Sequence, residues 1–176
     1  MRIEEEIKLD YSDVLFRPKR STLRSRKDVD LNRKYNFKYS KLSWKGTPII
    51  ASNMDGVGEI GIAKKLTSHK VMTALTKQHT IDQISLIYKN SDFHKSVALS
   101  CGTSDESYNR LKKILHKFPK FEFICIDVAN GYSENFSHFV SNVRKKYPKK
   151  TIIAGNVVTA DMTQELVLSG ADIVKV

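Results

Sequence analysis

Short apolar runs recur along the chain after Pro48, and helix-patterned polar stretches separate them. Several of the runs are rich in valine and isoleucine, as buried parallel strands tend to be. The runs occupy residues 48–52, 71–75, 96–101, 121–127, 151–155 and 171–176. This alternation of strands and helices predicts an α/β fold with a parallel sheet.

The stretches between the runs carry apolar residues at spacings of three and four, which is the period of one helix face. One stripe comprises Tyr132, Phe136, Phe139, Val140, Val143 and Tyr147, and another comprises Tyr108, Leu111, Ile114, Leu115 and Phe118. We interpret both stripes as contacts with the core. Thr80 and Gln83 form a capping-box pattern at a helix start, and Gly170 is placed to end a helix before the last run.

Six strands with five intervening helices fit either an open doubly wound sheet or a (β/α)8 barrel. A barrel needs eight strands and typically about 250 residues, whereas this chain has 176. If the fold is a barrel, about six βα units are present, and we expect the sequence to be the first part of a longer polypeptide. Residues 1–176 would then be a single, incomplete barrel domain, with an N-terminal arm at 1–47 and barrel strands one to six within 48–176.

The composition is basic, with 30 lysines and arginines against 19 aspartates and glutamates, a net charge of +11. Such a charge attracts phosphates, nucleotides and other anions. Residues 17–27 hold six bases and no acid. They lack the interleaved aromatic residues that stack on nucleic-acid bases, so we expect no nucleic-acid partner.

Membrane and secretion signals are absent from the sequence pattern. No apolar run approaches the length of a membrane span, and the charged opening residues lack the core of a signal peptide. Cys101 and Cys125 form no metal-binding or disulfide pattern, which is typical of a reducing compartment. We therefore expect a cytoplasmic protein without a membrane partner.

The segment GVGEIG, residues 56–61, matches the glycine pattern of dinucleotide-binding loops. Four residues separate it from the preceding strand, where the fingerprint turn is tight, and the usual acid at the end of the second strand is missing. We interpret this segment as a glycine-rich loop, and a Rossmann-type NADP oxidoreductase remains the rival interpretation.

Polar residues gather where the predicted strands end. In a barrel these ends converge on one mouth, where the chemistry takes place. They are Asn53, Met54, Asp55, Thr76, Lys77, His79, Ser100, Cys101, Gly102, Thr103, Asp127, Ala129, Asn130 and Asn156. We expect Lys77 and Asp127 to meet there, whereas Cys101 has no assigned base and Cys125 lies within a strand.

Four stretches of the sequence resemble the IMP dehydrogenase/GMP reductase family, and within it the reductase branch. They are KLDYSDVLFRPKRSTLRSRKDVDL (8–31), NMDGVG (53–58), CIDVANGYSE (125–134) and AGNVVTADMTQELVLSGADIVKV (154–176). The resemblance implies a (β/α)8 TIM barrel, a homotetramer, and NADPH-dependent reductive deamination of GMP to IMP and ammonia. In the dehydrogenase branch a regulatory module usually follows the second barrel helix, and residues 80–102 leave no room for one.

The resemblance also implies roles for individual residues. Lys77, Thr103 and Asp127 are implied as catalytic groups that organise the proton transfer to the departing amine. Contacts with NADPH are implied for Ser25, Arg26, Lys77, Asp127, Val128 and Ala129, the first two reaching the cofactor of a neighbouring subunit. Met54 is implied to lie against the purine.

The resemblance implies a covalent mechanism, in which a cysteine thiolate adds to C2 of the purine. The family's cysteine and its potassium site lie in a glycine-rich loop that would follow Val176, so we expect no metal ligand within this chain. Gly56, Thr76 and Gln78 differ from the residues that relatives commonly carry at these positions. These differences affect the expected geometry of cofactor binding more than the expected class of reaction. The alternatives are an IMP dehydrogenase and a non-catalytic nucleotide-binding fragment.

Overall fold

The computed structural model describes residues 5, 7, 9–89 and 91–176. The chain divides into two compact units, Met1–Asp30 and Leu31–Val176. The described part of the first unit buries no side chain and contains two 3-10 turns, η1 (Tyr11–Asp13) and η2 (Arg26–Asp28), each closed by a capping box. Residues 1–4, 6 and 8 of the predicted arm lie outside the described residues.

The second unit is built on a six-stranded parallel sheet whose strands follow one another in chain order. The strands are β3 (Ile50–Ala51), β4 (Met72–Leu75), β5 (Val97–Cys101), β6 (Phe123–Asp127), β7 (Thr151–Gly155) and β8 (Ile173–Lys175). A doubly wound sheet reverses its strand order at a switch point, and this sheet has no such reversal. The structure therefore confirms the partial barrel and excludes the open sheet.

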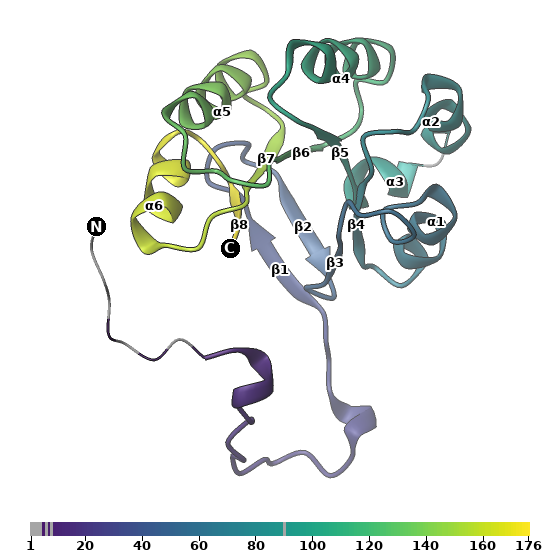
Figure 1. Cartoon of the computed structure of the whole chain (residues 1–176). Coiled ribbons are helices and arrows are strands. Elements are labelled where there is room, and N and C mark those ends of the chain that lie inside the picture. The colour runs from purple at the N-terminus through teal and green to yellow at the C-terminus, as the bar shows by residue number, and fades with distance from the viewer. Residues whose placement is uncertain (1–4, 6, 8, 90) are drawn as a thin grey trace. The chain divides into compact units, whose positions relative to one another are not determined.

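Helices cover one face of this sheet, as Figure 1 shows. They are α1 (Ile60–Ser68), α2 (Ile81–Tyr88), α3 (Ser91–Ser96), α4 (Asp105–Lys117), α5 (Glu134–Lys146) and α6 (Ala160–Leu168). The predicted capping box is confirmed, because the Gln83 amide donates to Thr80 and the Thr80 amide donates to Gln83. Gly170 follows α6 with φ of +107°, a left-handed conformation that favours glycine.

The predicted helix stripes are confirmed as core contacts, with Tyr132 as the exception. Phe136, Val140 and Val143 are buried on α5 between helix and sheet, and Phe139 and the C-cap residue Tyr147 are partly buried against the same core. Tyr132 is 41% exposed, because it belongs to the loop before α5. The stripe on α4 is buried through Leu111, Ile114 and Leu115 and continues to buried Phe118.

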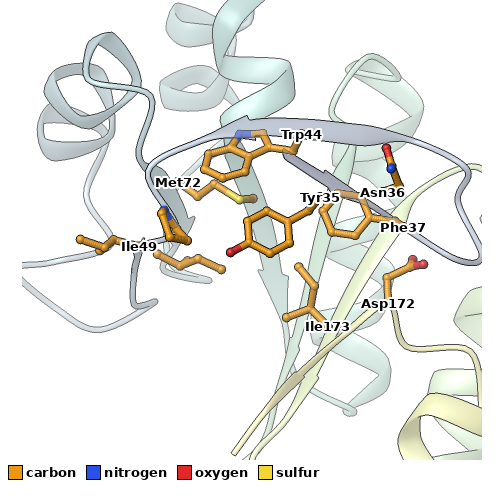
Figure 2. Close-up of a pocket in the computed structure, with 10 residues that line it drawn as sticks. Tyr35, Asn36, Phe37, Trp44, Ile49, Met72, Asp172 and Ile173 are labelled. Atoms are coloured by element: carbon orange, nitrogen blue, oxygen red, sulfur yellow. The ribbon is translucent and has the colours of Figure 1, made fainter. Parts of the chain in front are cut away.

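A hairpin of β1 (Arg33–Asn36) and β2 (Ser43–Gly46) belongs to the second unit, within the range that the sequence assigned to the arm. Phe37 and Trp44 from this hairpin region pack against inner-face side chains near the amino-terminal ends of the strands. Phe37 meets Phe123 edge-to-face, with ring centroids 5.6 Å apart. Figure 2 shows Phe37, Trp44 and Met72 around an apolar cavity of about 330 Å³.

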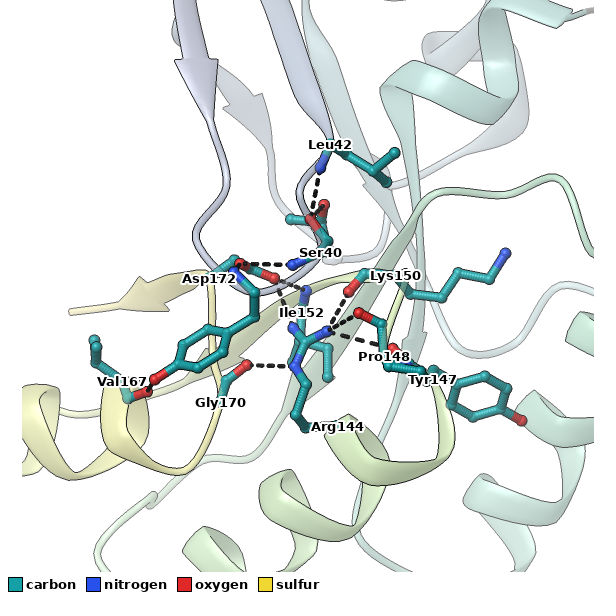
Figure 3. A network of polar contacts seen from close by, with 12 residues as sticks. Ser40, Leu42, Arg144, Tyr147, Pro148, Lys150, Ile152, Val167, Gly170 and Asp172 are labelled. Carbon is teal, nitrogen blue, oxygen red and sulfur yellow. Dashed lines mark hydrogen bonds and ion pairs between the residues drawn. The ribbon is translucent and has the colours of Figure 1, made fainter.

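The buried carboxylate of Asp172, just before β8, connects α5 with the turn of the hairpin. Arg144 Nη2 lies 2.6 Å from Asp172 Oδ2, and the Asp172 side chain is fully buried. The backbone amides of Tyr39 and Ile152 donate to the same carboxylate at 2.8 and 3.2 Å. The other guanidinium nitrogens donate to nearby carbonyls, including that of Lys150 at 2.7 Å (Figure 3).

Two classes of structure are absent from the part of the chain that is described. No helix there has the length and apolar composition needed to cross a membrane. Among the same residues, no group of three or more histidine, cysteine, aspartate or glutamate side chains is arranged to hold a metal ion.

Candidate functional site

An open cavity of about 820 Å³ lies at the carboxyl-terminal ends of β4 to β7. Lys77, Thr103, Asp127, Val128 and Ala129 all line it. The structure thus brings together five of the residues that the sequence singles out, from three different strand ends. The volume falls in the range of sites that hold small molecules and cofactors, roughly 300–1,000 Å³.

The helix α4 begins at the wall of this cavity, and the hydrogen bonds at its start show which hydroxyl groups cap the helix. The Ser107 amide donates to Ser104 Oγ at 3.3 Å, so Ser104 is the N-cap. The Gly102 amide donates to Ser107 Oγ at 2.8 Å, which ties the strand end to the first turn of the helix. Thr103 therefore lies, exposed, between two residues that perform these local structural tasks.

Asp127 forms an ion pair that the sequence analysis missed. Its Oδ1 contacts the ammonium of Lys175, the last residue of β8, and the same ammonium lies 3.2 Å from Asn53 Oδ1. Both charged side chains are mostly buried, at 28% and 29% exposure. One signal in the sequence could have placed Lys175 on the inner face of the sheet. Side chains two residues apart on a strand point to the same face, so Lys175 must share the face of apolar Ile173.

Lys77 lines the same cavity as Asp127 but is exposed. The sequence predicts that these two groups meet, and the structure brings them to one cavity while pairing Asp127 with a different lysine. Arg110 adds a second cation to the wall, and its guanidinium donates to the carbonyl of His79. Burial lowers the pKa of Arg110 from its ordinary value.

The remaining predicted contacts lie elsewhere. Met54 follows β3, is 64% exposed and is not among the residues that line the cavity. Ser25 and Arg26 belong to the first unit, where Ser25 Oγ accepts from the Lys27 amide at 3.2 Å. Their predicted roles toward substrate and cofactor stay predictions.

The glycine-rich loop at 56–61 packs against β4. The amides of Val57 and Gly58 both donate to the Met54 carbonyl, at 3.0 and 2.8 Å, and are thus engaged within the loop. A Cβ on Gly58 would lie 2.6 Å from the Ala74 carbonyl oxygen, so this glycine permits close packing. Because a phosphate loop needs amides directed at its ligand, the geometry supports the packing role.

Both cysteines are buried, and this burial favours the protonated form of their thiols. Burial raises the pKa of Cys101 to about 12 and that of Cys125 to about 11. The thiolate is the nucleophilic form. Neither cysteine is therefore suited to nucleophilic catalysis.

This chemistry predicts the response to a thiol reagent. At pH 8 the folded chain should release almost no thionitrobenzoate from Ellman's reagent, because roughly one thiol in 1,000 or fewer is ionised at those pKa values. Unfolding in guanidinium should expose both cysteines and release two equivalents. Rapid modification of the folded chain would contradict the burial and the raised pKa values.

Comparison with known proteins gives consistent matches. The family model described as the IMP dehydrogenase / GMP reductase domain matches residues 8–176. GMP reductases from Klebsiella pneumoniae subsp. pneumoniae and Shigella boydii serotype 4 are each 53% identical over 178 residues, covering 100% of this chain and 51% of the relative. The chain thus spans about half the length of the curated relatives it matches.

A solved structure gives the same match at the level of the fold. The crystal structure of inosine 5′-monophosphate dehydrogenase from Legionella pneumophila superimposes with a TM-score of 0.72 at 26% sequence identity. The superposition covers 93% of this chain and 48% of that one.

Proposed function

The chain belongs to the IMP dehydrogenase / GMP reductase family, and we propose from that premise that it contributes the amino-terminal half of a GMP reductase. The proposed reaction is the NADPH-dependent reductive deamination of GMP to IMP and ammonia. The observation that carries the proposal is the 53% identity to GMP reductases over the full length of this chain. The cavity at the strand ends supports it, because five residues implied in that reaction line one space.

The cavity wall fits a dinucleotide cofactor. Gly102 has no side-chain bulk and Ala129 has little, so a flat ring has room to approach the backbone there. Lys77 and Arg110 stand in the same wall beside the acids Glu106 and Asp127, and these two cations can pair with phosphates of the ligand. NADPH, when bound, would supply a hydride to C2 of the purine.

The chain's own residues would bind, orient and handle protons. We assign Asp127, Val128 and Ala129 to the nicotinamide end of the cofactor. We assign Lys77, Thr103 and Asp127 to the proton transfer that accompanies departure of the amine. Protonation is needed because an amine on an aromatic ring is a poor leaving group. Met54 is assigned to the purine.

The nucleophile must come from outside these residues, because both cysteines are buried and their thiol pKa values are raised. We propose that a cysteine following Val176 in the complete polypeptide forms the covalent bond to the purine, beside a potassium site. Ser25 and Arg26 would serve a neighbouring subunit in a homotetramer.

The test is an assay of the complete polypeptide with GMP and NADPH. Absorbance at 340 nm should fall while IMP and ammonia form in equal amounts. The dehydrogenase branch is the second candidate, favoured by the structural match to the Legionella enzyme. Oxidation of IMP with NAD, without turnover of GMP, would transfer the assignment to that branch.

A further inference from the structure

Asp127, Gly155 and Lys175 form one row across three adjacent strands. Asp127 on β6 pairs in register with Gly155 on β7, and Gly155 pairs in register with Lys175 on β8. All three lie on the inner face of the sheet, because Cys125, Ile153 and Ile173, two residues earlier on each strand, belong to the inner core. The acid and the lysine are therefore two strands apart, with a glycine between them.

The glycine leaves the space that the lysine stem occupies. A Cβ on Gly155 would lie 2.6 Å from Lys175 Cβ and 2.5 Å from the Lys175 carbonyl oxygen. Real Cβ atoms do not approach other atoms so closely. Gly155 thus lets the Lys175 side chain pass over β7 and reach the Asp127 carboxylate.

The lysine also connects this row to the other edge of the sheet. Its ammonium donates to Asn53 Oδ1 at 3.2 Å, and Asn53 follows β3, the strand farthest from β8 in the sheet order. One ammonium therefore links the loop after the first strand of the sheet to the ends of the fourth and the sixth. Because the pair is about 70% removed from solvent, its attraction is screened less than that of a surface pair.

We propose that Lys175 is a positioning residue that fixes the Asp127 carboxylate at the rim of the cavity, with Asn53 holding the ammonium in place. This inference rests on the proposed function, in which Asp127 contacts the nicotinamide end of the cofactor. Lys175 does not line the cavity, whereas Asp127 does. The lysine therefore acts through the acid.

The experiment is a double-mutant cycle in the complete polypeptide, with Lys175→Met, Asp127→Asn and both together. Lys175→Met keeps an unbranched side chain that is one atom shorter and removes the charge. We expect it to lower kcat/KM for NADPH about 10- to 100-fold, the loss typical of a charged hydrogen bond. The double variant should have a kcat/KM no lower than that of the less active single variant, because the two residues act as one unit. Lys175→Arg should recover part of the loss.

A matched control is Lys64→Met, which removes an exposed lysine on α1 and should leave kcat/KM unchanged. The thermal unfolding midpoint of each variant distinguishes a positioning role from a loss of the fold. A substitution that damages the fold lowers both the midpoint and kcat/KM. A substitution that removes only the positioning contact lowers kcat/KM and leaves the midpoint close to that of the wild type. Multiplicative losses in the cycle, or full activity of Lys175→Met, would overturn the inference.

The inference and the proposed function fail in different ways. A wild-type polypeptide that does not turn over GMP overturns the proposed function. The coupling between Lys175 and Asp127 would then be measured by urea unfolding of the same variants of the complete polypeptide. Additive changes in the unfolding midpoint there would overturn the pairing itself.

Discussion

Replacing Asp172 with alanine should lower the free energy of unfolding by about 3–5 kcal/mol, the cost of removing one partner of a buried ion pair. The Asp172 side chain is fully buried, and alanine would leave the Arg144 guanidinium without its carboxylate. The Tyr39 and Ile152 amides would lose their acceptor at the same time. Urea unfolding of the 176-residue chain, followed by circular dichroism, measures the change.

The control for this substitution is Glu165→Ala, which removes an exposed acid on α6, the helix immediately before Asp172. Its effect should stay within about 0.5 kcal/mol, as for most surface substitutions. Asp172→Asn should fall between the two, because an amide keeps one acceptor oxygen and loses the charge. A loss below about 1 kcal/mol for Asp172→Ala would show that the network contributes little to the stability of the fold.

Replacing Asp127 with asparagine should lower kcat of the complete polypeptide on the order of 100-fold or more, as expected for a group that organises proton transfer. The change keeps the shape of the side chain and removes its charge, so the ion pair with Lys175 is lost. Steady-state oxidation of NADPH with GMP gives kcat and KM separately. A change confined to KM would indicate uniform binding of substrate and transition state.

Two control substitutions test whether the effect is specific to Asp127. Asp161→Asn removes an exposed acid at the start of α6 and should leave kcat unchanged. Gly61→Ala tests the rival dinucleotide loop without disturbing the fold, because a Cβ there meets no atom within 4 Å. If Gly61→Ala abolished cofactor binding and Asp127→Asn did not, the cofactor would be assigned to the glycine-rich loop at 56–61 and not to the cavity that Asp127 lines.

The sheet and its outer helices were predictable because their signals are local. Runs of valine and isoleucine mark the strands, and the period of apolar residues on α4 and α5 marks the buried helix faces. The short helix α3 was missed, because six residues are too few to show a helical period. The hairpin of β1 and β2 was missed because every β1 residue is exposed, so the strand has no apolar alternation.

The candidate site was predictable in part. Residues that follow strand ends were found from chain position alone, and the structure places Lys77, Thr103 and Asp127 around one cavity. The pairing of Asp127 with Lys175 was not found, because it depends on the register of three strands and on a glycine in the middle one. Register is a property of the folded sheet, and no short stretch of the sequence encodes it.

The anchoring of the hairpin by Asp172 constrains the order in which the chain acquires structure. The Tyr39 amide and its acceptor are separated by 133 positions, so the ribosome makes the hairpin long before its anchor. At about 5–20 residues per second, that delay is roughly 7 to 27 s. Phe37 and Trp44 pack with buried residues of β4 to β7, among them Phe123, which are made before Asp172. The apolar contacts of the hairpin can therefore form before its polar anchor exists.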